Sequence, residues 1–208
     1  MARRSDHSRD ELYDIALNAA KTIIEKDGLD ALTARNVADA IGYSPGTLYN
    51  LFDNLNGLIL RLNSRTLDSL YAALNAIPRQ NNPEKDIRAL LDGYLGFLET
   101  SPHLWRALFE HTLPAGESLP EWYTLKIDRL MALIASTLSP IFKNPDGTEA
   151  DRAARILWAS LHGICSLSDT GKLDVVTTQT VGEMAESLVT HFVAGLKIKG
   201  TEPRGTSS

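Results

Sequence analysis

The sequence predicts an all-α protein. Apolar residues recur at intervals of three and four along most of the 208 residues, as they do on the buried face of an amphipathic helix. Proline, glycine and asparagine gather in a few short stretches between these segments, and no segment shows the apolar–polar alternation of a strand. We therefore expect about nine helices and no sheet.

The first helix is expected over residues 9–26. Ser8 stands three residues before Glu11, which is the spacing of a capping box. Gly28 supplies a residue that tolerates the left-handed backbone with which many helices end. The apolar residues between these ends recur at helical spacing: Leu12, Ile15, Ala16, Ala19 and Ile23.

Two short helices joined by a tight turn are expected next. Thr33 is placed to cap the first of them, which ends before Gly42. Ser44 is placed to cap the second, with Pro45 at the first helical position, where its missing N–H has no cost. The inward positions are apolar: Val37, Ala38, Ile41, Leu48, Leu51 and Phe52. This spacing fits a helix-turn-helix, although an ordinary helical hairpin in a core has the same spacing.

Six longer segments complete the predicted fold. They are a helix from about 54 to the break at 76–85, helices that begin behind Pro83 and Pro102, and helices over about 121–142, 149–168 and 177–198. We divide the chain into a three-helix helix-turn-helix domain over 1–53, a larger helical domain over 54–199 and a flexible tail over 200–208.

Composition excludes several classes of protein. No apolar run approaches the roughly 18 residues needed to span a bilayer, and the N-terminal arginines are not followed by the apolar segment of a secretory signal. The single cysteine, Cys165, fits a reducing compartment, so we expect a cytoplasmic protein. The chain has no nucleophile elbow, phosphate-binding glycine loop or zinc-like Cys and His spacing. We therefore expect neither an enzyme nor a metal or cofactor site.

The stretch "AAKTIIEKDGLDALTARNVADAIGYSPGTLYNLFDNLNGLI" resembles the N-terminal module of the TetR family of bacterial transcriptional regulators. The resemblance covers about residues 9–60. The matching residues are Ala19, Gly28, Thr33, Val37, Ala38, Gly42, Ser44, Gly46, Leu48, Tyr49, Phe52 and Leu58. It implies a homodimer whose two recognition helices bind a palindromic double-stranded DNA operator and which a small molecule releases from DNA.

The residues expected to touch DNA lie around the second helix of the pair, whose N-terminal end approaches the base edges in a helix-turn-helix. The candidates are Arg9, Thr33, Arg35, Ser44, Pro45, Gly46, Thr47, Tyr49 and Asn50, with Arg3 and Arg4 on an N-terminal arm. Two positions depart from the family, which often has histidine where this chain has Leu51 and lysine where it has Leu55. In the family both commonly touch phosphate, so those contacts are in doubt here.

The net charge of the DNA-binding module limits how the module can attract DNA. Residues 1–52 contain six Lys and Arg and eight Asp and Glu, a net charge of -2, within a chain of net charge -5. Attraction to DNA is therefore expected from individual arginines at the rim of the module rather than from a broad basic surface. For the arm, the alternative is a solvated segment without a DNA contact.

The C-terminal half is expected to form the dimer. "ILWASLHGICSL" places Trp158 and His162 on one helix face and resembles the Trp-His-Gly segment of one class of TetR-like C-terminal domains. The helices over 149–168 and 177–198 have apolar stripes too broad for a single interior face. In the family two such helices from each subunit form a four-helix bundle, so we expect a homodimer through these segments.

The same half is expected to hold an apolar or aromatic effector. The candidate wall residues are Tyr94, Trp105, Phe109, Trp122, Trp158 and His162. Gly93 and Gly96 interrupt a helix, each at a cost of about 1 kcal/mol relative to alanine, which favours close helix approach or space for a ligand. The alternative is a solid aromatic core.

These observations favour a ligand-responsive DNA-binding repressor. The competing interpretation is a helical partner-binding scaffold, or a small-molecule-binding protein, without DNA-binding activity.

Overall fold

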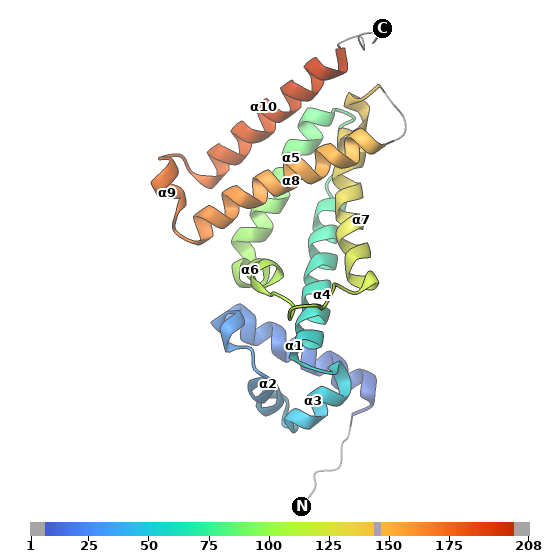
Figure 1. The fold of residues 1–208 in the computed structure, drawn as a ribbon, viewed down its shortest axis with the longest axis vertical. Helices are drawn as coiled ribbons and strands as arrows, with labels where there is room; N and C mark the ends of the chain where they lie inside the picture. Colours follow the sequence, from blue (N-terminus) through green and yellow to red (C-terminus); the bar gives the residue numbers. More distant parts are fainter. Residues whose placement is uncertain (1–6, 144–146, 202–208) are drawn as a thin grey trace, which may run out of the picture. The chain divides into compact units, whose positions relative to one another are not determined.

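The computed structural model describes residues 7–143 and 147–201, and all regular secondary structure in these ranges is helical (Figure 1). The elements are α1 (Arg9–Asp27), η1 (Leu29–Ala31), α2 (Ala34–Ile41), α3 (Pro45–Phe52), α4 (Leu55–Asn75), α5 (Pro83–Thr100), α6 (Pro102–Glu110), α7 (Glu121–Leu138), η2 (Ser139–Ile141), α8 (Thr148–Asp169), α9 (Leu173–Val176) and α10 (Val181–Thr201), where η marks a 3₁₀ helix. The all-α prediction is confirmed. The described ranges hold ten α-helices rather than nine, because α9 is a single turn and too short to show an apolar period.

Short-range signals fix the helix ends of the N-terminal module. Ser8 Oγ accepts a hydrogen bond from the N–H of Glu11 at 3.3 Å, and Glu11 Oε2 accepts one from the N–H of Ser8 at 2.7 Å. Thr33 Oγ1 accepts the N–H of Asn36 at 3.0 Å. Gly42 ends α2 with φ at 75°, in the left-handed region that other residues rarely adopt. The predicted capping box and both predicted ends of α2 are confirmed.

Contacts divide the described chain into two compact units. The first contains the residues up to Leu70 together with 97–126, and the second contains 71–96 together with the residues from Ile127 onward. Helices α4, α5 and α7 each contribute to both units. The predicted domain boundary after residue 53 lies within the first unit and stays a prediction.

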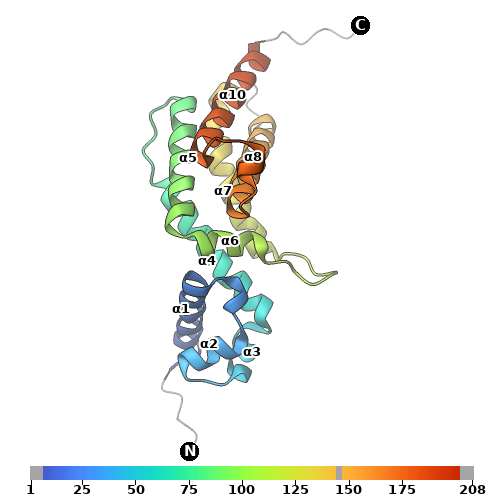
Figure 2. The ribbon, with the colours of Figure 1, turned by 90° about the vertical axis from the view of Figure 1, so that its left-hand side faces the viewer.

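The core of the first unit joins α6 to the N-terminal helices. Figures 1 and 2 show α2 and α3 beside α1, which they contact. The buried core side chains are Ala16, Leu17, Ala20, Ile24, Leu32, Val37, Ala38, Leu48, Phe52, Leu58, Ile59, Leu62, Leu104 and Ala107. The last two belong to α6, and His103 at its start donates from Nδ1 to the carbonyl oxygen of Glu25 at 2.9 Å. The N-terminal three-helix module is therefore supported by a helix that is distant in sequence.

The second unit is built around α8 and α10, which lie side by side (Figure 1). Arg88 on α5 donates to Glu186 Oε1 at 2.8 Å and to Thr190 Oγ1 at 2.9 Å, both on α10. Lys197 Nζ donates to Glu84 Oε2 at 2.7 Å. These solvent-exposed ion pairs contribute little to the stability of the fold, and they mainly set how α10 lies along α5.

Candidate nucleic-acid interface and apolar pocket

Helix α3 has one buried face and one exposed face. Leu48 and Phe52 are buried in the core of the first unit. Tyr49 and Asn50 lie on the opposite side, where the tyrosine is 48% exposed. About half of the Tyr49 side chain is therefore open to solvent, and Asn50 beside it is also exposed. The exposed face of α3 is the part of the module that is free to contact a partner.

The N-terminal end of α3 presents small and polar groups. Ser44 occupies the N-cap position, as predicted, but its hydroxyl lies 3.1 Å from the hydroxyl of Thr47 instead of capping a backbone N–H. Pro45 and Gly46 are exposed in the first turn, and a Cβ added at Gly46 would meet only Ser44 Oγ, at 3.7 Å. Pro45 has no N–H, and the N–H of Thr47 donates to the carbonyl oxygen of Ser44 at 3.0 Å, so among these residues it is the N–H of Gly46 that can approach a phosphate, which the helix N-terminus favours.

Helix α1 holds α3 in place. Arg9 donates from its guanidinium to the carbonyl oxygen of Asn50 at 3.3 Å, and the rings of Tyr13 and Phe52 stack with centroids 4.6 Å apart. Arg35 is exposed in the first turn of α2, and Thr33 is exposed at its cap. The other two predicted DNA-binding residues, Arg3 and Arg4, lie outside the described residues.

One contact at the edge of the module was not predicted. His7 Nδ1 lies 3.0 Å from the hydroxyl of Tyr43, which belongs to the turn between α2 and α3. The two residues are 36 positions apart, so no local spacing rule could pair them. The contact brings the chain just before α1 beside the turn that precedes the recognition helix.

The two departures from the family pattern serve packing. Leu51 and Leu55 are partly buried and lie against the core of the first unit. Neither side chain can donate a hydrogen bond to phosphate. The positions where the family often carries histidine and lysine therefore contribute apolar contacts to this fold.

The joint between α3 and α4 is tight and strained. Asp53 has φ at 65° and ψ at -48°, and the N–H of Asn54 donates across it to the carbonyl oxygen of Phe52 at 2.7 Å. This is a γ-turn with positive φ, a rare conformation that costs a residue with a side chain about 1–3 kcal/mol. Asn54 Oδ1 then accepts the N–H of Gly57 at 2.8 Å and so caps the start of α4.

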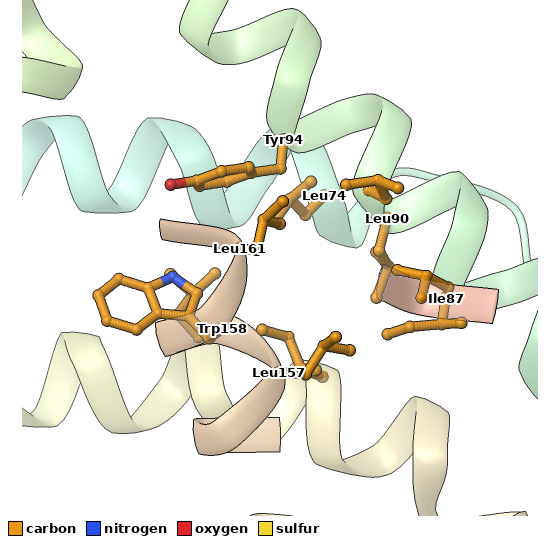
Figure 3. A pocket seen from close by; sticks show the side chains of 11 residues that line it. Leu74, Ile87, Leu90, Tyr94, Leu157, Trp158 and Leu161 are labelled. Atoms are coloured by element: carbon orange, nitrogen blue, oxygen red, sulfur yellow. The ribbon is translucent and has the colours of Figure 1, made fainter. Parts of the chain in front are cut away.

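The second unit contains an apolar pocket. Its walls come from α4, α5, α7, α8 and α10, and the lining residues are Leu74, Ile87, Leu90, Leu91, Tyr94, Leu130, Ile134, Leu157, Trp158, Leu161 and Val189. Figure 3 shows Tyr94 and Trp158 toward one end and Ile87 and Leu90 toward the other. The empty space, including the opening to solvent, is about 450 Å³, but only a small part of it is wide enough for a water molecule. A ligand larger than a few atoms therefore requires the walls to move apart.

The six predicted wall residues fall into two groups. Tyr94 and Trp158 line the pocket, and the ring of His162 stacks on that of Trp158 with centroids 5.3 Å and planes 5° apart. Burial lowers the pKa of His162, which favours its neutral form. The other three belong to the first unit: Trp105, Phe109 and Trp122.

Trp105, Phe109 and Trp122 make aromatic and cation–π contacts within the first unit. The rings of Trp105 and Phe109 have centroids 5.2 Å apart, and the Arg61 guanidinium lies 3.9 Å from the Trp122 ring centroid. Most of the pocket wall is aliphatic and was not predicted. At the level of sequence these leucines and isoleucines have the same helical spacing as core residues, so the pattern contains no signal that separates pocket from core.

The glycines of α5 differ in their surroundings. A Cβ at Gly93 would lie 2.7 Å from Cδ1 of Ile77, so this glycine allows α5 to approach the chain that follows α4. A Cβ at Gly96 would meet no atom within 4 Å. Of the two reasons expected for these glycines, close helix approach therefore applies to Gly93.

Helix α8 has an exposed apolar stripe away from the core. Ile156 is 50% exposed and Leu167 is 37% exposed, and between them Ala159 and Gly163 face solvent at helical spacing. On α10, Gly195 and Ile198 are also exposed. Small and apolar residues at this spacing leave a smooth surface against which another helix can pack.

Two further properties bear on the class of protein. Within residues 7–143 and 147–201 no helix is long and apolar enough to cross a membrane. The same residues contain no group of three or more His, Cys, Asp or Glu that could hold a metal ion.

Both halves of the chain match models of known families. Residues 16–62 match the model for "Bacterial regulatory proteins, tetR family", and residues 87–192, just over half of the chain, match the model for "Tetracyclin repressor-like, C-terminal domain". An uncharacterized HTH-type transcriptional regulator of Mycobacterium tuberculosis is 27% identical over 208 residues, which is 100% of this chain and 89% of that protein. The regulator AlkX of the same organism is 27% identical over 165 residues, 77% of this chain and 76% of AlkX.

Solved structures share the fold. A protein of unknown function from Rhodococcus sp. RHA1 has a TM-score of 0.71 at 23% identity and covers 94% of this chain and 100% of its own. A TetR variant from Acinetobacter baumannii in complex with minocycline has a TM-score of 0.64 at 16% identity and covers 90% of this chain and 97% of its own. At these identities the likeness concerns the fold alone.

The matches select among the functions that the sequence left open. They set aside a scaffold without DNA-binding activity, and they place the chain among regulators and not enzymes. The narrower Trp-His-Gly class of the C-terminal domain is not named by either match and stays a prediction. The chain is therefore a member of the TetR family, a helix-turn-helix, DNA-binding transcriptional regulator.

Proposed function

We propose that the protein is a homodimeric repressor that binds a palindromic operator in the cytoplasm and leaves it when a small apolar or aromatic effector enters the pocket of the second unit. The observation that carries the effector half of this proposal is the pocket itself, whose eleven lining residues are all apolar or aromatic. Sites for small ligands have this character, with a few polar groups to fix orientation.

Operator binding is supported by the exposed face of α3. Tyr49 and Asn50 project from a helix whose other face is fixed in the core, so the module can present them without rearrangement. Arg9 and Arg35 lie on α1 and α2, where they supply positive charge around an uncharged recognition helix. In a dimer two such modules contact half-sites about one turn of DNA apart.

Dimerisation is supported by the exposed stripe of α8. A face with Ile156, Ala159, Gly163 and Leu167 in solvent is unfavourable in a monomer and favourable when a second copy covers it. The stacked pair of Trp158 and His162 on the same helix supports placing the domain in the Trp-His-Gly class.

The narrow, apolar form of the pocket supports control by an effector. Its walls are apolar but close together, so a ligand that binds must displace helices α5 or α8, which carry Tyr94 and Trp158. A ligand that favours the opened form then shifts the protein toward it, and a coupling of about 1–3 kcal/mol is typical of such linkage. A structure of the same fold holds minocycline, which agrees with a small-molecule site.

The test combines DNA binding with ligand binding. Fluorescence anisotropy with DNA from beside the coding region measures operator affinity, and a panel of apolar and aromatic compounds is then added. We expect the active compounds to weaken DNA affinity about 5- to 150-fold. Trp105→Phe with Trp122→Phe leaves Trp158 as the one tryptophan, so that its emission reports on the pocket. If no compound alters either the emission or the DNA affinity, effector control is excluded; if no DNA binds, the repressor proposal fails.

A further inference from the structure

The recognition helix contains no charged side chain. Its sequence is "PGTLYNLF", and the residue that caps it is a serine. We infer that the base pairs facing the exposed side of α3 are A·T, with Asn50 contacting adenine and Tyr49 lying against a thymine methyl group. This inference rests on the proposed operator binding and names the class of sequence that the operator contains.

Base edges in the major groove differ in the side chains they accept. Arginine and lysine pair with guanine, and carboxylates accept from cytosine. Asparagine and glutamine pair in bidentate fashion with adenine, and apolar groups contact the thymine methyl. Helix α3 has neither the usual partner of guanine nor that of cytosine. It does have the usual partner of adenine, at Asn50, and apolar surface at Pro45 and Tyr49.

The contacts of α3 leave these groups available to bases. Arg9 binds the main-chain carbonyl of Asn50, so its guanidinium fixes the helix without using the side-chain amide. The hydroxyls of Ser44 and Thr47 are paired with each other at 3.1 Å. Gly46 has no side chain, which lets the first turn of α3 lie close to DNA and brings the next turn, with Tyr49 and Asn50, toward the base edges.

Basic side chains approach from other helices. Arg9 belongs to α1 and Arg35 to the first turn of α2, which precedes the turn of the motif. Guanine contacts are therefore expected at the flanks of each half-site, and the positions beneath the exposed face of α3 are expected to be A·T.

Selection from a random DNA library with the full-length protein, followed by sequencing, tests the inference. At the positions that respond to Asn50 we expect the wild type to favour A·T over G·C by about 5- to 150-fold, as for one bidentate contact. Asn50→Ala should flatten the preference there, and Asn50→Arg should change it to guanine. Arg35→Ala is the matched control: it should lower affinity or alter flanking positions and leave the Asn50 positions unchanged. Circular dichroism checks that each variant is folded.

Two results would overturn the inference. In the first, the wild type selects G·C base pairs at operator positions where Asn50→Ala or Tyr49→Ala changes the base preference. The other is an Asn50→Ala variant with the same preferences as the wild type at every position. If no sequence is enriched with any variant, operator binding itself is contradicted, and the inference falls with it.

Discussion

A Cβ atom at Gly57 would lie 2.0 Å from the carbonyl oxygen of Phe52. That oxygen also accepts the N–H of Asn54 in the strained turn at Asp53, so moving it away from a Cβ at Gly57 would disturb this hydrogen bond. The glycine is therefore what allows α4 to begin immediately after the recognition helix. It fixes the orientation of α3 within the module.

Gly57→Ala should destabilise the DNA-binding module. Relief of a contact this short requires the joint between α3 and α4 to open, and we expect a loss of about 2–4 kcal/mol in the free energy of unfolding, as for other substitutions that force backbone movement. Thermal and urea denaturation measure the change. Gly46→Ala is the matched control, because its Cβ would meet only one atom, at 3.7 Å, and its stability should stay within about 0.5 kcal/mol of the wild type. Equal melting of Gly57→Ala and the wild type would exclude this account.

Tyr49→Ala should weaken operator binding by about 1–3 kcal/mol while the fold is retained, since the side chain is 48% exposed and contributes little to the core. Anisotropy with labelled operator measures the affinity, and a thermal melt measures the stability. Leu48→Ala, one position earlier, is 3% exposed and should instead cost about 2–5 kcal/mol of stability. A Tyr49→Ala protein that binds normally, or one that unfolds, would show that the ring is not a DNA contact.

Local chemistry determined how much could be predicted. The caps at Ser8 and Thr33 and the end of α2 at Gly42 depend on residues within four positions of each other, and the sequence pattern identified all three. The inward face of α3 followed from the same helical spacing. These features concern neighbours in the chain, for which spacing alone is sufficient.

Long-range packing could not be predicted in this way. His103 bonds to Glu25, 78 positions away, and no periodicity relates α6 to α1. The aromatic residues Tyr94, Trp105 and Trp122 are near one another in sequence, but Tyr94 belongs to the second unit and Trp105 and Trp122 belong to the first. An apolar stripe shows that a helix face is buried and does not show what it is buried against.

Arg3→Ala combined with Arg4→Ala tests the arm and leaves the capping box of Ser8 intact. If both arginines touch phosphate, the slope of log affinity against log salt should fall in magnitude by about 0.9 for each phosphate that is no longer neutralised. Anisotropy titrations at four or five salt concentrations give the slope. Lys21→Ala with Lys26→Ala, on the exposed side of α1, removes the same charge elsewhere in the module. An unchanged slope in the arginine variant would mean that the arm does not contact DNA.

If the protein dimerises through α8 as proposed, Ala159→Arg should give monomer or aggregate, because it places a charge within the exposed stripe between Ile156 and Gly163. Sedimentation velocity measures the change. Ala73→Arg on the exposed side of α4 makes the same chemical change elsewhere and should leave the dimer intact. Val189 on α10 is unsuitable for this purpose, because it is 1% exposed and lines the pocket, so a charge there would disrupt the core. A dimeric Ala159→Arg protein would place the interface elsewhere.

Leu161→Phe should weaken the response to an effector and preserve DNA binding. Leu161 lines the pocket beside Trp158, and a larger ring there occupies space that a ligand needs. Overpacking costs about 1–3 kcal/mol of stability, which is less than the free energy of unfolding of a typical domain, about 5–15 kcal/mol, so the variant should stay folded.

Leu133→Phe is the matched control, since Leu133 is buried in the second unit and does not line the pocket. We expect operator affinity in the absence of ligand to be the same in both variants. With ligand, DNA release should persist in Leu133→Phe and require at least about tenfold more compound in Leu161→Phe, which corresponds to ligand binding weaker by about 1.4 kcal/mol. Equal ligand sensitivity in the two variants would place the effector site outside this pocket.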